Sequence, residues 1–259
     1  MTKIAFLGSH PLGERCLELL HEDERIDVPV VVTYPEGYDS WWDGSVLNFA
    51  EQLGYEVLPI SRERDVLHFE IDYLMSVYYP NILDADLLSH PEYGAVNLHQ
   101  AELPRYRGSN VFSHSIMNAR ADDHWKHGTT LHAMAEQVDA GDIIDRRFVE
   151  ITEEDTARTL YEKVREASVE LFETHLDEFA EKSIIGGATS QSEFVGERYF
   201  YNKDSLDELK KFSRAELTTM DQDELYDRVR ALDFPPFEPA YVELDDHRIY
   251  LTKTGYERD

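Results

Sequence analysis

Short apolar runs alternate, over much of the chain, with segments in which apolar residues recur at helical spacing. The first run covers residues 3–7, and Leu12, Cys16 and Leu19 then recur every three or four positions. Continued along the chain, the pattern predicts strands over residues 3–7, 28–33, 55–60, 71–77, 95–99, 129–134 and 143–149, and helices over residues 12–22, 45–53, 110–118 and from 152 onward. Strands that alternate with helices are typical of an α/β fold, in which helices flank a mostly parallel sheet.

Local signals mark the ends of two of these helices. Ser45 is a candidate N-cap for the helix over residues 45–53, and Gly54 would end it. Thr152, with Asp155 three residues further on, predicts a capping box at the start of the long helix.

Glycine-rich composition occurs at residues 186–190, which read Gly-Gly-Ala-Thr-Ser. This linker-like segment predicts a large domain over residues 1–187 and a small α+β domain over residues 191–259. Within the small domain the pattern predicts one helix and a two-stranded hairpin, over residues 221–232, 241–244 and 248–252, with a turn at 245–247.

Three polar side chains stand where the predicted elements would bring them together. Asn97 and His99 are two residues apart in the strand 95–99 and therefore point to the same side. The strand 129–134 continues into a glycine-containing loop that carries Asp139. An imidazole, an amide and a carboxylate at neighbouring strand ends can serve as a base, a donor to an oxyanion and an orienting group.

The turn at residues 103–108 reads Leu-Pro-Arg-Tyr-Arg-Gly and supplies two cationic side chains next to these strands. Arg105 and Arg107 could bind a phosphate group through two parallel hydrogen bonds each. For Arg105, a surface ion pair is almost as well supported in so acidic a chain. Arg230 is equally consistent with a structural ion pair and with a phosphate contact.

The segment 34–45 shows no periodicity and contains Trp41 and Trp42, so it is predicted to be a surface loop. The two tryptophans are consistent with either of two roles. They could frame a ligand, or they could pack against the rim of the sheet.

Histidines near the candidate site raise the question of a metal ion. His127 and His132 would provide two ligands at uneven spacing, and the single cysteine, Cys16, is distant in the sequence. We therefore predict no metal site. His132 alternates with Leu131 in its strand and is predicted to pack behind the site.

Charge is the most unusual feature of the composition. The 259 residues include 53 Asp and Glu against 25 Lys and Arg, which gives a formal net charge of −28. Such a surface repels a phosphate backbone, so broad contact with nucleic acid is disfavoured. From Ser190 onward, 17 acidic residues face 10 basic ones, a net charge of −7. Acidic residues spread along the whole chain, with scarce lysine, are typical of proteins from salt-accumulating organisms, although an ordinary acidic cytoplasmic protein is the alternative.

The salt-accumulating interpretation makes a prediction. At about 1 M salt the Debye length falls to about 3 Å, which screens the repulsion between carboxylates. We expect the melting temperature to be lower in low salt than in molar salt. A melting temperature that does not change between the two would contradict the interpretation.

Several classes of protein are disfavoured by what the sequence lacks. No apolar run reaches the length of a membrane span, and residues 1–7 do not resemble a secretory signal peptide. Gly8 and Gly13 are not followed by Lys-Ser or Lys-Thr, and the dinucleotide fingerprint GxGxxG is absent. A single cysteine allows no internal disulfide and fits a reducing compartment. We therefore expect a cytoplasmic protein.

Four motifs occur in a fixed order: N-x-H at Asn97 and His99, LPxYRG at residues 103–108, G-T-x-x-H at residues 128–132, and x-D-x-G-D at residues 138–142. Together they resemble the folate-dependent formyltransferases, which act on glycinamide ribonucleotide, methionyl-tRNA or nucleotide-sugar amines. The resemblance covers roughly residues 1–185 and implies a Rossmann-like catalytic domain. The tail RALDFPPFEPAY is most similar to the end of the nucleotide-sugar enzymes.

The resemblance implies a role for each matching residue. Asn97 would donate to the oxyanion, His99 would move a proton, and Asp139 would orient His99. The co-substrate would be 10-formyltetrahydrofolate, and the segment SVYYPNIL resembles the one whose backbone receives the pterin. The resemblance thus assigns the folate to Ser76, Tyr78, Pro80, Ile82 and Val138. It assigns the acceptor substrate to Arg105, Tyr106, Arg107 and Gly108.

The function expected is transfer of a formyl group to a primary amine on a nucleotide-linked sugar by an enzyme that could form a homodimer. Alternatives are a methionyl-tRNA formyltransferase, against which the charge and the tail argue, and an enzyme acting on a purine precursor. A hydrolase that passes the formyl group to water would keep the same three residues. A folate-binding protein without activity is the least favoured alternative.

Overall fold

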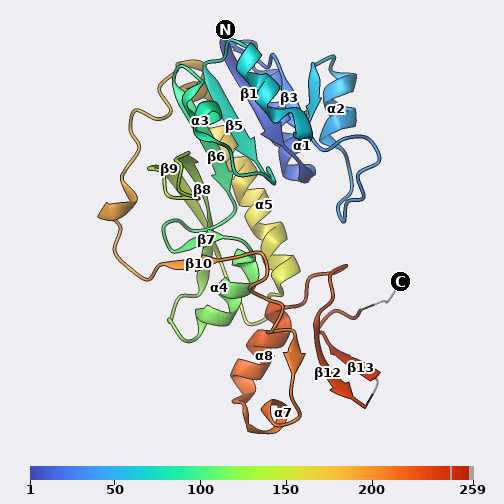
Figure 1. The fold of residues 1–259 in the computed structure, drawn as a ribbon. Helices are drawn as coiled ribbons and strands as arrows, with labels where there is room; N and C mark the ends of the chain where they lie inside the picture. The colour runs from blue at the N-terminus through green and yellow to red at the C-terminus, as the bar shows by residue number, and fades with distance from the viewer. Residues whose placement is uncertain (246, 257–259) are drawn as a thin grey trace.

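The computed structural model describes residues 1–245 and 247–256, and an eight-stranded sheet forms its centre (Figure 1). The strand order is β4-β3-β1-β5-β6-β8-β9, with β2 paired to β1. The neighbours from β1 to β6 pair in parallel, whereas β8 pairs antiparallel with both β6 and β9. This arrangement confirms the predicted mostly parallel α/β fold. The strands are β1 Thr2–Gly8, β2 Ile26–Asp27, β3 Val31–Thr33, β4 Val57–Pro59, β5 Tyr73–Val77, β6 Gly94–His99, β8 Lys126–Ala133 and β9 Ile143–Glu150.

Helices cover both faces of this sheet. In β1, Ile4 and Phe6 enter the core beneath α1 and α5, while Ala5 and Leu7 enter the core beneath η1 and α3. This division follows from the alternation of side chains along a strand. The helices of this part are α1 His10–Glu22, α2 Val46–Gln52, the 3₁₀-helix η1 Ile60–His68, α3 Ala85–Ser89, α4 Val111–Ala119, α5 Ala157–Thr174 and α6 Leu176–Ala180.

Of the two predicted helix starts, the structure confirms one. Ser45 caps α2 as expected, because its hydroxyl accepts the Asn48 N–H. The capping box predicted at Thr152 was wrong: α5 begins after Thr156, whose hydroxyl accepts the Thr159 N–H while the Thr159 hydroxyl accepts the Thr156 N–H. The Asp155 carboxylate does accept the Thr152 N–H, which is one half of such a box. The other half is missing, because the Thr152 hydroxyl donates to the same carboxylate and the Asp155 N–H bonds to the Thr152 carbonyl oxygen, which forms a turn ahead of the helix. The strand predicted over residues 28–33 is also shorter, since β3 contains only its second half.

The C-terminal part carries the predicted helix and hairpin, as α8, β12 and β13, and also four elements that the sequence did not predict, η2, β10, β11 and α7. Strand β10 pairs in parallel with β7, the strand of the LPRYRG turn, far away in sequence. The chain then forms the three-stranded sheet β11-β12-β13 with α7 and α8 beside it, at the bottom of Figure 1. Residue 246 of the predicted hairpin turn lies outside the described residues. The elements are β7 Tyr106–Gly108, η2 Gln191–Glu193, β10 Tyr199–Tyr201, β11 Lys211–Phe212, α7 Glu216–Thr219, α8 Gln222–Ala231, β12 Ala240–Leu244 and β13 His247–Leu251.

The residues in and after the linker-like segment contact strands of the part before it. Thr189 bridges Ile143 at the start of β9, and β10 lies on β7. A division into domains at residues 187 and 191 stays a prediction, and these contacts belong to the surface along which the two parts meet.

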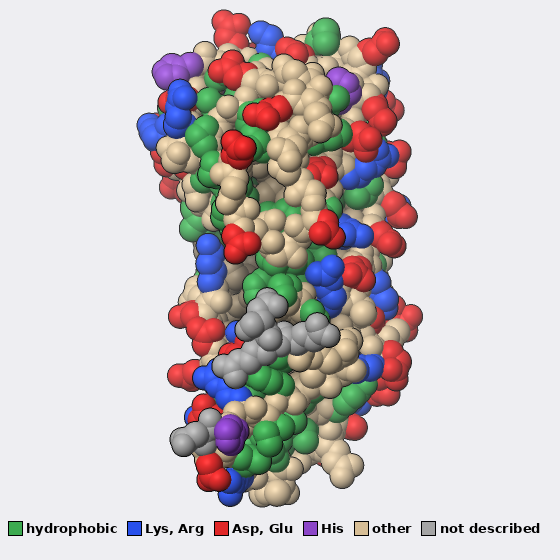
Figure 2. Space-filling model, turned by 90° about the vertical axis from the view of Figure 1, so that its right-hand side faces the viewer, with side chains coloured by type: hydrophobic (Ala, Val, Ile, Leu, Met, Phe, Trp, Pro, Cys, Tyr) green, Lys and Arg blue, Asp and Glu red, His purple; other side chains and the backbone are tan. Residues whose placement is uncertain are grey.

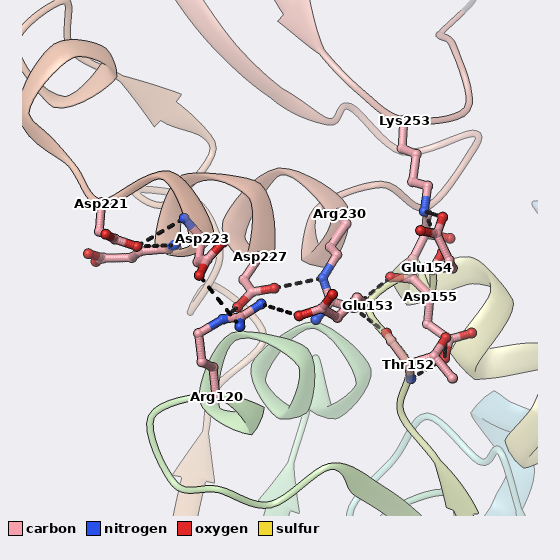
Figure 3. A network of polar contacts seen from close by, with 12 residues as sticks. Arg120, Thr152, Glu153, Glu154, Asp155, Asp221, Asp223, Asp227, Arg230 and Lys253 are labelled. Carbon is pink, nitrogen blue, oxygen red and sulfur yellow. Dashed lines mark hydrogen bonds and ion pairs between the residues drawn. The ribbon is translucent and has the colours of Figure 1, made fainter.

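A buried ion pair also joins the two parts (Figure 3). Arg230 of α8 is fully buried, and its Nε lies 2.8 Å from Asp227 Oδ1. Its Nη1 donates to the carbonyl oxygens of Thr152 and Asp155, each at 2.9 Å. Asp227 also accepts a hydrogen bond from Arg120 Nε at 2.8 Å. Of the two roles open for Arg230, the structure therefore places it in a structural ion pair.

The loop over residues 34–45 packs inward through its two tryptophans. Trp41 contacts the rings of Tyr161, Phe234 and Phe237, with centroids 5.1 to 5.7 Å apart. Trp42 stacks on His10 at 3.6 Å. The loop thus bridges the first turn of the sheet and the C-terminal part.

Acidic side chains are spread over the molecular surface. In the face shown in Figure 2 they are scattered from end to end and do not gather in one patch. This distribution matches the diffuse acidity of the sequence. The salt dependence of stability stays a prediction.

Candidate active site

Strand β6 holds two of the candidate residues in the middle of the sheet. Asn97 lies between Ser76 of β5 and His132 of β8, and His99 pairs with Thr130 of β8. Both side chains share the face of Ala95, as the two-residue spacing predicted. The strand pairing therefore brings His132 next to Asn97 without any contribution from loops.

Asp139 reaches these residues from the loop between β8 and β9. Its Oδ2 lies 3.6 Å from His99 Nε2 and accepts the Gly108 N–H at 2.9 Å, and its Oδ1 lies 3.9 Å from His132 Nε2. Burial alone would raise the pKa of Asp139, but His99, the Gly108 N–H, His132 and Arg107 together hold that pKa below its ordinary value. The carboxylate is therefore ionised at neutral pH and faces the imidazole of His99.

The position of His99 selects its tautomer. Nε2 lies 3.3 Å from the Tyr106 carbonyl oxygen and 3.6 Å from the Asp139 carboxylate, and both groups only accept hydrogen bonds. Nε2 must therefore carry the proton. Among the described residues, Nδ1 has no hydrogen-bond partner, and it is not one of the buried polar atoms. A neutral His99 thus presents its lone pair at Nδ1.

His132 fixes the orientation of the Asn97 amide. Its Nδ1 lies 2.8 Å from the Ala133 carbonyl oxygen and so carries the proton, which leaves Nε2 to accept from Asn97 Nδ2 at 3.1 Å. Burial lowers the pKa of His132 to about 4, although Asp139 opposes the shift, so the ring is neutral at neutral pH. One N–H of the Asn97 amide is used by His132, and the second remains for another acceptor.

The segment predicted to receive the folate continues from β5, directly beside Asn97. Ser76 is buried, Tyr78 has a left-handed backbone with φ of 52°, and Ile82 is 75% exposed. Pro80 and, on the Asp139 loop, Val138 are half-buried. Within the described residues, the backbone N–H groups of Tyr79, Asn81 and Ile82 donate to no other protein group. The backbone there is free to bind a ligand with its own donors and acceptors.

The residues predicted to bind the acceptor are held by neighbours within the chain. Arg105 forms an ion pair with Asp122, and Arg107 donates to the side chain of Gln191. The Tyr106 ring is fully buried, so only its backbone faces the site. A Cβ at Gly108, where φ is +86°, would lie 2.2 Å from the Tyr201 carbonyl oxygen, so strand β10 requires glycine there.

Comparisons with known proteins show what this chain is similar to. Residues 59–176 match the family described as Formyl transferase. A methionyl-tRNA formyltransferase of Listeria innocua is 27% identical over 99% of this chain and 80% of its own length. Residues 59–176 therefore carry a domain of the Formyl transferase family. Two solved structures share its fold. One is an N-formyltransferase of Helicobacter canadensis in complex with folinic acid and dTDP-3-aminofucose, with a TM-score of 0.75, 19% identity and coverage of 96% of this chain and 86% of that one. The other is a 4-N formyltransferase of Francisella tularensis, with a TM-score of 0.75, 20% identity and coverage of 97% of both chains.

Two groups that complete the site were not predicted from the sequence. Gln191 donates to the carbonyl oxygens of Asp139 and Gly141, and β10 pairs with the turn that carries Gly108. Both come from the C-terminal side of the linker-like segment and follow no periodic pattern. Only the departure of Gln191 from the otherwise small and polar composition around it could have drawn attention to it.

The described residues were also compared with the requirements of a metal site and of a membrane span. In the described ranges, no three His, Cys, Asp or Glu side chains group closely enough to hold a metal ion. No helix of residues 1–245 or 247–256 is long and apolar enough to cross a membrane. His127, one of the two histidines considered as ligands, is fully buried and donates from Nε2 to the Gln100 carbonyl oxygen at 3.1 Å.

Buried neutral histidines make this formyltransferase sensitive to acid. Burial lowers the pKa of His127 to about 3 and that of His132 to about 4, whereas both titrate near 6.5 in an unfolded chain. Below about pH 6.5 the unfolded state binds protons that the folded state does not. The free energy of unfolding therefore decreases as the pH is lowered, by up to about 1.4 kcal/mol per pH unit for each histidine. Urea unfolding at about pH 7.5 and 5.5 measures the loss, which over that range amounts to about 1.4 kcal/mol in total for each histidine.

The slope can be assigned with single variants. His127→Phe should reduce the loss between pH 7.5 and 5.5 by about 1.4 kcal/mol, while His21→Ala, at an exposed position, should leave it unchanged. Equal slopes for wild type and His127→Phe would show that His127 does not contribute.

Proposed function

We propose that this formyltransferase moves the formyl group of 10-formyltetrahydrofolate to a primary amine on a nucleotide-linked amino sugar. The observation that carries the choice of acceptor is charge, since the part of the chain after residue 190 has a net charge of −7. A part with that charge repels the phosphate backbone of tRNA. The likeness in fold to the Helicobacter canadensis enzyme, whose structure holds dTDP-3-aminofucose, extends over 96% of this chain and supports the same acceptor class.

The transfer is a displacement at the formyl carbon in which one C–N bond forms and another breaks. The neutral amine attacks the formyl carbon, and the carbonyl oxygen becomes an oxyanion. The free N–H of Asn97 is the donor for that oxyanion, because His132 occupies only the other N–H. The amine then loses a proton, the bond from the formyl carbon to the folate nitrogen breaks, and that nitrogen takes up a proton.

His99 moves the proton between the two nitrogens. Its Nδ1 accepts the proton of the attacking amine and returns it to the leaving folate nitrogen. Asp139 holds Nε2–H and stabilises the imidazolium while the proton resides on the ring, from a distance of 3.6 Å. Because the pKa of Asp139 is held below its ordinary value, the carboxylate does not take the proton itself.

The folate is proposed to bind along residues 76–82, with Val138 beside it. A pterin presents donors and acceptors on one edge, and the unpaired backbone N–H groups of Tyr79, Asn81 and Ile82 suit such an edge. Arg107 is proposed to contact the acceptor, whereas Arg105 is held by Asp122 and supports the turn. The homodimer expected from the sequence stays a prediction.

Methionyl-tRNA is the second candidate acceptor. The observation in its favour is the 27% identity to the Listeria innocua enzyme over 99% of this chain. Hydrolysis of the folate is the third possibility, since water in place of the amine would use the same three side chains.

The experiment measures release of tetrahydrofolate at high salt from 10-formyltetrahydrofolate alone, with a panel of nucleotide-linked amino sugars, and with methionyl-tRNA. Release that requires an amino sugar, with a formyl group found on that sugar, is the result we expect. Release that requires methionyl-tRNA would replace our acceptor with the tRNA, and release without any acceptor would indicate a hydrolase.

A further inference from the structure

Gln191 is buried at the first position after the glycine-rich segment, and its side chain uses both ends of its amide. It is 3% exposed and begins η2. Nε2 donates to the carbonyl oxygens of Asp139 at 2.9 Å and Gly141 at 2.7 Å. Oε1 accepts a hydrogen bond from Arg107 Nη2. One neutral side chain therefore connects the loop of Asp139 to the turn of Arg107.

The loop that Gln191 holds has an unusual backbone. Asp139 adopts a left-handed conformation with φ of 51°, which is uncommon for a residue with a side chain. Gly141 lies so close to β8 that an added Cβ would stand 1.8 Å from the Ala133 carbonyl oxygen. The two hydrogen bonds from Gln191 fix the carbonyl groups on either side of Ala140, and so fix the direction in which the Asp139 side chain leaves the backbone.

Arg107 is held in the same way from the other side. Its Nε is buried without a hydrogen-bond partner in the described part of the chain, and Nη2 is the atom that reaches Gln191. The next residue, Gly108, donates its N–H to Asp139 Oδ2 at 2.9 Å. Gln191 thus closes a ring of contacts that runs from Asp139 to Gly108, Arg107 and back.

An amide is the side chain that fits this position. The two carbonyl oxygens need a donor, and Arg107 needs an acceptor. A glutamate could still accept from Arg107, but its carboxylate would face two carbonyl oxygens without a proton to share. A methionine of similar size would supply neither bond.

We infer that Gln191 is a positioning residue, through which the segment after the glycine linker holds Asp139 against His99 and Arg107 toward the acceptor. The inference rests on the roles proposed for Asp139 and Arg107. It assigns to the C-terminal side of the linker a part in the geometry of a site whose motifs all precede it.

Three variants test the inference. Gln191→Met removes all three hydrogen bonds, and Gln191→Glu keeps the acceptor for Arg107 but removes both donor bonds. The matched control is Glu193→Gln, in the same turn, where the side chain is exposed and forms no recorded hydrogen bond with the described residues. Each is measured for kcat, for KM of the amine acceptor, and for amide hydrogen exchange over residues 135–143.

We expect kcat to fall by about 10- to 100-fold in both Gln191 variants, because a small displacement of a catalytic group costs up to about 100-fold. KM for the acceptor should rise in Gln191→Met and stay near the wild-type value in Gln191→Glu, where Arg107 keeps its partner. Exchange should accelerate over residues 135–143 in both variants and nowhere else. Glu193→Gln should match the wild type in all three measurements.

Two results would overturn the inference. One is wild-type kcat and wild-type exchange in Gln191→Met. The other is faster exchange over the whole sheet together with a lower melting temperature, which would mean that Gln191 only supports the fold. The exchange measurement needs no substrate, so it tests whether Gln191 stabilises the Asp139 loop even if the wild type uses another acceptor.

Discussion

Alanine in place of His99 is expected to lower kcat for formyl transfer by about 10²- to 10⁴-fold, the usual contribution of a positioned acid–base group. The reason is that Nδ1 carries the lone pair that receives the proton of the amine. Among the residues that the structure describes, no other imidazole has a free nitrogen near the Asp139 carboxylate. His132, the nearest, is 2% exposed and uses both of its ring nitrogens. The measurement is the initial rate of tetrahydrofolate release at saturating substrates.

The fold should survive this substitution, because His99 is half-buried and its side chain makes one hydrogen bond within the described residues, to the Tyr106 carbonyl oxygen. His68→Ala, at an exposed position of η1, is the control and should retain wild-type kcat. Asn97→Ala and Asp139→Ala should also abolish transfer without unfolding the protein. Since the three groups act as one unit, combining the substitutions should cost little more than the most harmful single one. Turnover at the wild-type rate in any single variant would remove that residue from the mechanism.

Asp227→Ala is expected to lower the free energy of unfolding by about 3–5 kcal/mol, as removal of one partner of a buried ion pair does. The substitution would leave the fully buried guanidinium of Arg230 with two carbonyl oxygens and no counter-ion (Figure 3). It would also release Arg120, which now bonds Asp227 from α4. Urea unfolding monitored by circular dichroism gives the difference in free energy.

Asp223→Ala is the matched control for this prediction. Asp223 lies one turn earlier in α8, contacts the same Arg120 at 3.6 Å, and has a side chain that is 67% exposed. An exposed ion pair contributes only about 0–1 kcal/mol. Equal losses in the two variants would mean that burial of Arg230 does not determine the effect.

The sequence predicted the parts of this molecule that depend on short-range patterns. Alternation along β6 was sufficient to place Asn97 and His99 on one side, and strand–helix alternation was sufficient for the parallel sheet. The N-cap of α5 could not be chosen in the same way, because Thr152 and Thr156 are both suitable residues. The two hydroxyls differ only in the folded molecule, where that of Thr156 accepts the Thr159 N–H and that of Thr152 donates to the Asp155 carboxylate.

Long-range contacts between short segments could not be predicted at all. Strand β10 has three residues and therefore no measurable period, and its partner β7 is distant in the chain. The same holds for Gln191, whose importance follows only from what it touches. The sequence thus led to the three candidate catalytic residues, and the contacts that hold their loops became visible only in the folded molecule.

The pairing of β10 with β7 has a consequence for the order in which the protein is made. A ribosome synthesises the four motifs well before residues 199–201, yet the turn that carries Arg107 and Gly108 gains its neighbouring strand only when those residues emerge. The sheet from β1 to β9 can form during synthesis, since domains generally fold as units from the N-terminus. A chain interrupted before β10 would therefore contain every motif residue of the family and still lack the strand that braces the turn beside Asp139.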